Sequence, residues 1–179
     1  CKDTIAQQAV EHGAAVLVVD DRYVIGSRSG PVILTEHMKV DVHELIRDRN
    51  ICVVTVRDTR KALSALSAAF FDYPAERMKM IGITGTNGKT TTAFLTAGIL
   101  QEAGYRVGMI GTIESYDGRR RETVKNTTPE SCEIHRLLFR MVENECDCCV
   151  MEVSSQGIAL QRTADVFFDI GVFLNIEPD

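Results

Sequence analysis

The sequence predicts an α/β protein, with a small N-terminal α/β domain followed by a second domain built on a mostly parallel sheet. Short β-branched runs such as AVLVVD and ICVVTV are typical of buried parallel strands. Stretches with helical spacing separate these runs, and strands that alternate with helices indicate an α/β fold. The strand–helix pattern starts again at Lys79, which indicates a second domain.

The first domain is expected to span residues 1–77. TIAQQAVEHGA has helical spacing and ends at Gly13, a residue suited to a helix C-terminus. DTRKALSALSAAFFDYP predicts an amphipathic helix that starts at Asp58 or Thr59 and ends before Pro74. The domain boundary is therefore expected between Pro74 and Met78.

The second domain, residues 78–179, is expected to open with a strand, KMIGIT, and a helix that Gly104 closes. RVGMIGTI follows as a strand, and SYDGRRRE reads as a solvated hairpin tip. TPESCEIHRLLFRMVENE predicts a helix that starts near Thr128, because Pro is favoured in a first helical turn. CCVMEV and FDIGVFLNI are the next predicted strands.

The composition is that of an ordinary globular protein, with 45% hydrophobic and 25% charged residues among 179. A net charge of -5 argues against nucleic-acid binding through a basic face. No apolar run approaches the about 20 residues of a membrane helix, so membrane insertion is not expected. The chain starts at Cys1 and stops just after a predicted strand, and a fragment of a longer protein is expected.

Six cysteines show no spaced disulfide framework, and free thiols are expected. Cys146 and Cys149 formally make a C-x-x-C pair. They lie at the entry to a predicted buried strand, where neighbouring side chains point to opposite faces. Small buried hydrophobic residues are therefore favoured over a zinc site.

The stretch IGITGTNGKTTT, residues 81–92, predicts a phosphate-binding loop between a strand and a helix. Gly85 and Gly88 would let backbone N–H groups turn toward an anion, Lys89 would reach the terminal phosphates, and Thr90 would hold Mg²⁺. The helix N-terminus adds its dipole. Ile83 stands where the general P-loop pattern has glycine, so this is a variant of the motif.

Two further stretches carry polar residues next to predicted elements. NTTPES places Thr127 and Thr128 just before a helix, where they suit a polar substrate or, alternatively, a helix cap. MEVSSQGIALQR ends a strand with Glu152 and brings Arg162 ten residues later. A carboxylate at the C-terminal edge of a parallel sheet can hold a metal ion, or can cap a helix.

TGTNGKTT, NTTP, MEVSSQG and NIEPD, in this order, resemble the Mur ligases, in particular the branch that makes the UDP-MurNAc-tripeptide. The resemblance covers essentially the whole chain. It implies that residues 1–77 are part of a UDP-substrate-binding domain and that residues 78–179 are part of a P-loop-type central ATPase domain. The C-terminal amino-acid-binding domain of such enzymes would be absent from this chain.

The resemblance also implies roles for individual residues. Lys89 and Glu152 would be the catalytic residues. The residues that would bind ATP are Gly85, Thr86, Asn87, Gly88, Lys89, Thr90, Thr91 and Asn175. Those that would contact UDP-MurNAc-L-Ala-D-Glu are Thr127, Thr128, Ser154 and Arg162. Those that would hold Mg²⁺ are Thr90, Glu152 and Gln156. Gln156 stands where many relatives have His, Leu160 stands where several have Gln, and Asp179 completes an N-x-x-x-D element with Asn175.

The chemistry that the resemblance implies is an ATP-dependent ligation in peptidoglycan synthesis. The D-Glu carboxylate would attack the γ-phosphorus of ATP, and the amine of a diamino acid would then displace phosphate from the acyl phosphate. meso-Diaminopimelate is favoured over L-lysine. The enzyme is expected to be a cytoplasmic monomer, and this chain alone is expected to bind nucleotide weakly without completing the ligation.

Alternative interpretations stay open from the residues alone. The phosphate loop also fits another Mur-type ligase or a folylpolyglutamate synthetase. A Mur-like amidotransferase subunit is disfavoured because this sequence lacks a four-cysteine zinc ribbon. A nucleotide-binding module that has lost catalysis is the alternative from a different functional class.

Overall fold

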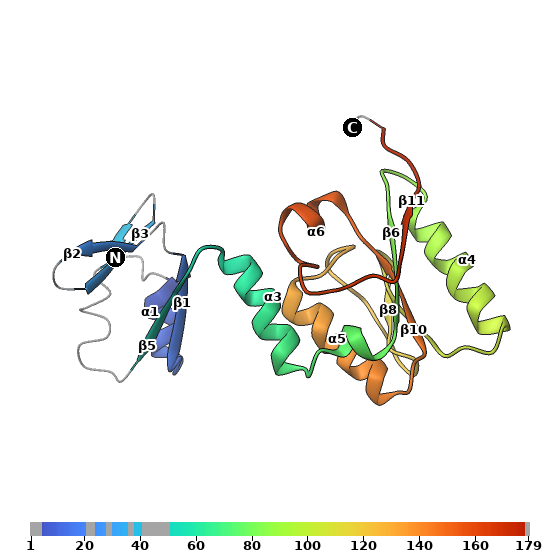
Figure 1. Cartoon of the computed structure of the whole chain (residues 1–179), viewed down its shortest axis with the longest axis horizontal. Helices are drawn as coiled ribbons and strands as arrows, with labels where there is room; N and C mark the ends of the chain where they lie inside the picture. Colours follow the sequence, from blue (N-terminus) through green and yellow to red (C-terminus); the bar gives the residue numbers. More distant parts are fainter. Residues whose placement is uncertain (1–4, 21–23, 28–29, 36–37, 41–50, 178–179) are drawn as a thin grey trace. The chain divides into compact units, whose positions relative to one another are not determined.

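The chain divides into two compact units, Cys1–Thr59 and Arg60–Asp179 (Figure 1). The computed structural model describes residues 5–20, 24–27, 30–35, 38–40 and 51–177. None of the helices in these ranges is long and apolar enough to cross a membrane. The two units together give a mixed α/β protein with a mostly parallel main sheet, as the sequence predicts.

The first unit contains a helix and a parallel strand pair. α1 (Ile5–Glu11) is followed by Gly13, whose φ of 91° confirms the predicted helix end. β1 (Val16–Asp20) pairs in parallel with β5 (Cys52–Val56), which confirms both predicted strands. The predicted burial is wrong for β5, in which no residue is buried, whereas its partner β1 buries Leu17 and Asp20.

The first unit also contains an antiparallel sheet that the sequence analysis missed. It consists of β2 (Val24–Ser27), β3 (Gly30–Thr35) and β4 (Met38–Val40), in that spatial order. These strands are short, and β2 and β3 contain glycine or proline, which ordinarily signal turns rather than strands.

α3 (Thr59–Phe70) confirms the predicted helix, and Pro74 begins the short 3₁₀ helix η2 (Pro74–Arg77). α3 lies within the second unit, where the N–H of Asp165 donates to Ser64 Oγ at 3.1 Å. The boundary between the two units is therefore at Thr59, ahead of the expected boundary near residue 77.

The second unit is built on a six-stranded sheet in the order β11-β6-β10-β7-β8-β9. β11, β6, β10 and β7 are mutually parallel, and β8 and β9 form the predicted antiparallel hairpin. The strands are β6 (Lys79–Thr84), β7 (Val107–Ile110), β8 (Ser115–Tyr116), β9 (Arg121–Glu122), β10 (Cys148–Glu152) and β11 (Ile170–Phe173).

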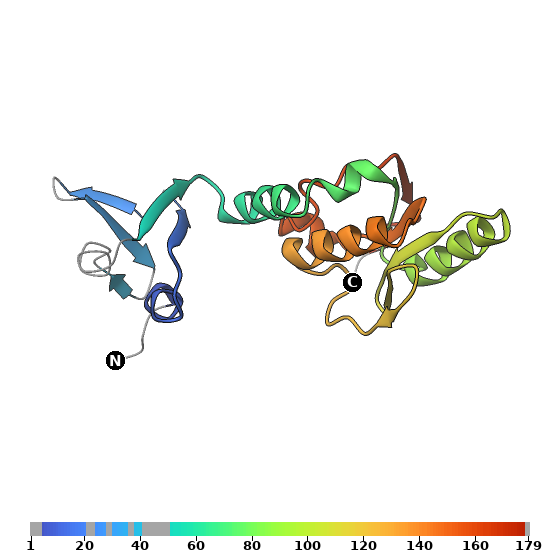
Figure 2. The same ribbon diagram turned by 90° about the horizontal axis from the view of Figure 1, so that it is seen from below.

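Helices cover both faces of this sheet (Figures 1 and 2). α4 (Lys89–Glu102) and α5 (Ser131–Glu143) confirm the two predicted helices. Alternate strand residues enter two separate cores: Met80 packs with the apolar side chains of α5, and Ile81 packs with those of α4. The parallel strands are therefore fixed from both sides, and the segments that follow them meet at one edge of the sheet.

The cysteines of the described residues are free thiols, as predicted. Cys146, Cys148 and Cys149 are buried, and burial raises the pKa of each, that of Cys146 to about 11. All three pack within the hydrophobic cores, which confirms the prediction that they act as small buried hydrophobic residues.

Candidate nucleotide and acceptor site

The predicted phosphate loop connects the C-terminal end of β6 to the N-terminus of α4. Gly88 caps α4 with a φ of 85°, and as a glycine it offers no side-chain hydrogen bond to the N–H groups of the first turn. Gly85 has a φ of 145°, and a Cβ there would lie 3.1 Å from Leu174 Cβ. Both glycines are therefore required by backbone conformation, and Gly85 also by its close approach to the chain after β11.

Lys89 is the first residue of α4 and folds back over the phosphate loop. Its Nζ donates to the carbonyl oxygens of Gly85 at 2.6 Å and Thr86 at 3.0 Å. None of the salt bridges found within the described ranges involves Lys89. Its positive charge is thus held at the loop without a carboxylate that would compete with an anionic ligand.

The segment after β11 binds the back of the phosphate loop through Asn175. The N–H of Asn87 donates to Asn175 Oδ1 at 3.0 Å, and Asn175 Nδ2 donates to the carbonyl oxygen of Asn87 at 3.2 Å. Glu177 adds a second attachment, because its N–H donates to Thr86 Oγ1 at 3.0 Å. Asn175 therefore contacts the loop itself, and Asp179 lies outside the described residues.

Glu152 is the last residue of β10, and its side chain is buried with 1% exposure. Thr90 Oγ1 donates to Glu152 Oε2 at 2.8 Å. Thr112, which follows β7, donates its N–H to Oε1 at 2.9 Å and its Oγ1 hydroxyl lies 3.0 Å from Oε2. A Cβ on Gly111 would lie 2.4 Å from Oε1, so the carboxylate occupies space that only glycine leaves open.

The donor chemistry around Glu152 fits a hard divalent cation. The carboxylate is buried, takes part in none of the ion pairs seen among the described residues, and is surrounded by hydroxyl oxygens of Thr90 and Thr112. Mg²⁺ takes oxygen ligands, and it is ordinarily held by one or two carboxylates together with substrate phosphates. A single carboxylate beside the phosphate loop matches that pattern. Gln156 is an exposed residue of α6 (Ser155–Ala159), and its role as a metal ligand stays a prediction.

The predicted acceptor residues lie beside Glu152. Thr128 is buried, and its Oγ1 accepts from the N–H of Ser154 at 2.9 Å and donates to the carbonyl oxygen of Glu152 at 3.1 Å. Ser154 Oγ in turn accepts from the N–H of Gly157 at 3.0 Å and caps α6. These hydroxyls hold the turn after β10, whereas the Thr127 hydroxyl lies 3.0 Å from Thr112 Oγ1.

Arg162 is also brought to this region and is 9% exposed. Its Nη1 donates to the carbonyl oxygen of Thr128 at 3.0 Å, and its Nη2 forms an ion pair with Glu130 at 2.7 Å. Its Nε is buried without a partner within the described ranges. The predicted substrate residues thus form one group, and an unpaired guanidinium N–H remains within it.

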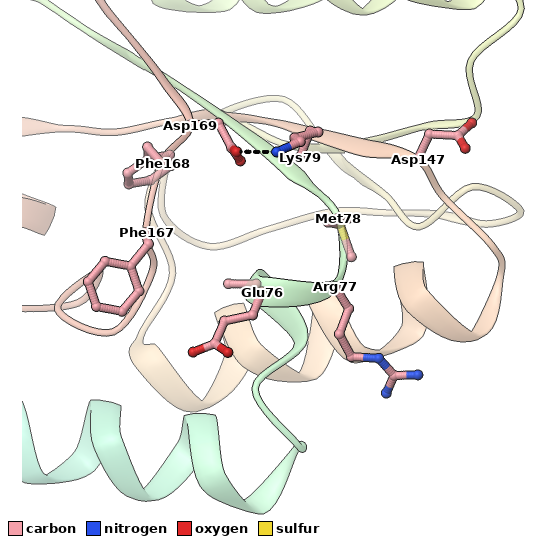
Figure 3. A pocket seen from close by; sticks show the side chains of 9 residues that line it. Glu76, Arg77, Met78, Lys79, Asp147, Phe167, Phe168 and Asp169 are labelled. Atoms are coloured by element: carbon pink, nitrogen blue, oxygen red, sulfur yellow. Dashed lines mark hydrogen bonds and ion pairs between the residues drawn. The ribbon is translucent and has the colours of Figure 1, made fainter.

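A cavity of about 450 Å³ lies at the other end of the sheet (Figure 3). Glu76, Arg77 and Lys79 line it together with Phe167 and Asp169, and Lys79 Nζ pairs with Asp169 Oδ1 at 2.6 Å. Because Lys79 begins β6 and the phosphate loop follows its end, the cavity is at the edge opposite the phosphate loop. It is not part of the nucleotide and acceptor site.

Sequence reasoning missed three residues of this site: Gly111, Thr112 and Glu177. A signal for Thr112 was available, because the Gly-Thr pair directly follows β7, and the ends of neighbouring parallel strands meet. No local signal marks Glu177, whose contact with the phosphate loop depends on the pairing of β11 with β6.

Comparisons with known proteins agree with this geometry. The Mur ligase middle domain matches residues 83–179. A UDP-N-acetylmuramoyl-L-alanyl-D-glutamate--2,6-diaminopimelate ligase of Clostridium perfringens (strain 13 / Type A) is 43% identical over 163 residues, which are 90% of this chain and 33% of that protein. The enzyme of the same name from Clostridium tetani (strain Massachusetts / E88) is 39% identical over 173 residues, 97% of this chain and 32% of that protein.

The chain thus spans about a third of the length of these relatives. A solved structure of a UDP-N-acetylmuramoyl-L-alanyl-D-glutamate--2,6-diaminopimelate ligase has a TM-score of 0.60, with 22% identity over 71% of this chain and 26% of that one. This likeness supports the fold. The matched residues 83–179 include the phosphate loop, Glu152 and Arg162, and by this middle domain the chain belongs to the Mur ligase family.

Proposed function

We propose that this chain carries the nucleotide-handling part of an ATP-dependent ligase that adds meso-diaminopimelate to UDP-MurNAc-L-Ala-D-Glu. The observation that carries the proposal is the buried Glu152 carboxylate beside Thr90 at the end of the phosphate loop. The names of the relatives support the choice of acceptor and of meso-diaminopimelate over L-lysine. The substrate and the amino acid are proposals, because the chain spans about a third of those proteins.

In the proposed reaction, an oxygen of the D-Glu carboxylate attacks the γ-phosphorus of ATP, and ADP leaves. The amine then attacks the acyl carbon, loses a proton, and displaces phosphate. Lys89 and the first-turn N–H groups of α4 would neutralise phosphate charge, and Thr127 and Arg162 would orient the acceptor. Thr90 and Glu152 would hold Mg²⁺, which supplies further charge neutralisation when it is bound.

Roles for the two parts of the chain belong to the same proposal. Residues 1–77 would contribute to binding of the UDP-linked substrate, and residues 78–179 would bind ATP. The enzyme would act as a monomer in the cytoplasm, a reducing compartment in which the free thiols of the described cysteines persist.

The first test is nucleotide binding by the purified chain, measured by calorimetry with a non-hydrolysable ATP analogue and Mg²⁺. Lys89→Ala should weaken binding by about tenfold or more, because it removes a charge-assisted contact with phosphate. Lys125→Ala, a change of another lysine, which is exposed, is the matched control and should leave the affinity unchanged. Equal affinities for all three proteins would contradict the assignment of the loop.

A second test addresses the reaction. This chain would replace the corresponding third of the Clostridium perfringens relative, and phosphate release would be measured with ATP and UDP-MurNAc-L-Ala-D-Glu. Phosphate release that requires both UDP-MurNAc-L-Ala-D-Glu and meso-diaminopimelate is the expected result, and it would show that this chain supports the ligation. Nucleotide binding by the chimera without phosphate release would favour a non-catalytic module.

A further inference from the structure

A continuous line of oxygen atoms joins the nucleotide side of the site to the acceptor side. Thr90 Oγ1 lies 2.8 Å from Glu152 Oε2, which lies 3.0 Å from Thr112 Oγ1. Thr112 Oγ1 in turn lies 3.0 Å from Thr127 Oγ1. Thr112 is thus the single side chain that touches both the Glu152 carboxylate and the NTTP segment in this line.

The number of protons fixes the direction of the hydrogen bonds along this line. A hydroxyl has one hydrogen to donate, and a carboxylate is an acceptor only. Thr112 must therefore donate its hydrogen to Glu152 Oε2, and the short contact with Thr127 then requires Thr127 to donate to Thr112. In this state the hydrogen of the Thr127 hydroxyl is not available to a substrate.

The two carboxylate oxygens of Glu152 are held differently. Oε1 accepts from the backbone N–H of Thr112 and lies against Gly111, where a Cβ would come within 2.4 Å. Among the described residues, Oε2 accepts only from the hydroxyls of Thr90 and Thr112, which can rotate. A cation would therefore engage Oε2, and it would weaken that oxygen as an acceptor for Thr112.

We propose that Thr112 is a positioning residue that transmits the charge at Glu152 to Thr127. When the negative charge of Glu152 is neutralised, the Thr112 hydroxyl turns to donate to Thr127, and the hydrogen of Thr127 becomes free for the acceptor. Neutralisation of the Glu152 charge beside the nucleotide thereby makes the Thr127 hydroxyl available to hydrogen-bond the acceptor. The link to acceptor binding rests on the proposed function. The change in the Thr112 hydrogen bond depends only on residues of this chain.

The transmission can be tested without any ligand by a double-mutant cycle read out by the ¹³C-methyl chemical shift of Thr127. Glu152→Gln removes the charge with little change in shape, and it should move the Thr127 methyl signal in the wild-type background. The same change in a Thr112→Val background should leave that signal in place, because the hydroxyl link is gone. In a Thr112→Ser background, which keeps the hydroxyl, the movement should be restored.

An equal movement of the Thr127 signal in the Thr112→Val and wild-type backgrounds would overturn the inference, because a general distortion would then be its cause. If the Thr127 signal still moves in the Thr112→Ser background, loss of the movement in Thr112→Val is due to the missing hydroxyl. It is then not due to a change in side-chain size at this position. Thr112→Val keeps the backbone bond to Oε1, so Glu152 should remain in place.

A ligand experiment distinguishes this inference from the proposed function. Addition of Mg²⁺ with a non-hydrolysable ATP analogue should shift the backbone amide signals of Gly88 and Lys89 in wild type and in Thr112→Val alike. The Thr127 methyl signal should shift only in wild type. Absence of the loop shifts would count against the proposed function alone, while the ligand-free cycle would still decide the role of Thr112.

Discussion

His135 is a buried titratable residue that the site does not use. It lies in α5 with 0% exposure, and neither ring nitrogen has a hydrogen-bond partner within the described ranges. Burial lowers the pKa of His135 below its ordinary 6.5, although the nearby Asp165 carboxylate acts in the opposite direction. The folded protein therefore holds this imidazole neutral at a pH at which the unfolded chain would protonate it.

This residue predicts an acid sensitivity. Above pH 6.5 the imidazole is neutral in both states, and its contribution to stability is fully present; as the pH falls toward the lowered pKa, the unfolded state binds more protons and stability decreases. His135→Leu should remove this loss, and it should also stabilise the protein at neutral pH by about 1 kcal/mol because two unpaired nitrogens disappear.

Urea unfolding of wild type and His135→Leu at a series of pH values checks this prediction. The difference between the two proteins isolates His135 from the carboxylates, which titrate in both. A difference in unfolding free energy that stays constant from neutral to acidic pH would show that His135 does not carry the effect.

At the scale of elements, the phosphate loop owes its shape to a segment 88 residues away in sequence. The Asn175 side chain pairs with both polar groups of the Asn87 backbone, as a neighbouring strand would. Gly85 allows Leu174 to approach, and Glu177 bonds to Thr86. The loop is consequently attached to the end of β11 as well as to β6 and α4.

Removal of this attachment should loosen the loop without unfolding the sheet. In Asn175→Ala, amide hydrogen exchange of Asn87 should become about tenfold faster, because the two side-chain bonds to its backbone are lost. Protection of the amides in β6 should not change. Asn126→Ala, a change of an exposed asparagine outside these contacts, serves as the control. Unchanged exchange at Asn87 would mean that Asn175 does not hold the loop.

At the scale of the whole molecule, α3 and η2 belong with the middle-domain sheet. Ala68 in α3 and Ala75 in η2 are 1% and 4% exposed, and the rings of Phe71 and Phe139 lie 5.8 Å apart. The contacts place these elements within Arg60–Asp179. The smallest unit that folds is therefore expected to begin near residue 60 rather than near residue 78.

Truncation tests this expectation. A protein of residues 60–179 should unfold cooperatively, with a free energy of unfolding close to that of the second unit in the whole chain. A protein of residues 78–179 should lose at least about 3 kcal/mol, comparable with the loss of one well-buried large side chain, because the surface under α3 and η2 becomes exposed. Equal urea midpoints for the two truncated proteins would refute the expectation that the folding unit begins near residue 60.

Much of the second unit was predictable, because its signals are local. The β-branched runs, the phosphate-loop motif and glycines such as Gly104 mark where strands and helices begin and end. The sheet order and the oxygen cluster were not, because they depend on pairing between distant strands. Thr112 and Glu152, for example, are 40 residues apart.

The first unit shows the opposite balance. β2 and β3 contain glycine or proline and β4 has only three residues, so the pairing of these strands outweighs the local preference for turns. In the second unit, α3 was predicted as amphipathic, yet it buries Ser64, Ser67 and Ala68 and leaves Leu66 and Phe70 exposed. Helical spacing predicted the element correctly, but the face it buries is set by neighbouring elements.

The oxygen cluster around Glu152 has a consequence for how the chain acquires a ligand. Its members come from the first turn of α4, the segment after β7 and the end of β10, and Thr90 and Glu152 are separated by 62 residues. A partly folded chain in which only the phosphate loop and α4 have formed would have Thr90 in place but would lack Glu152 and Thr112 beside it. Mg²⁺–nucleotide would then bind only chains in which the sheet is complete. In a cell, this binding would stabilise the native protein against proteolysis, and it would not stabilise partly folded chains.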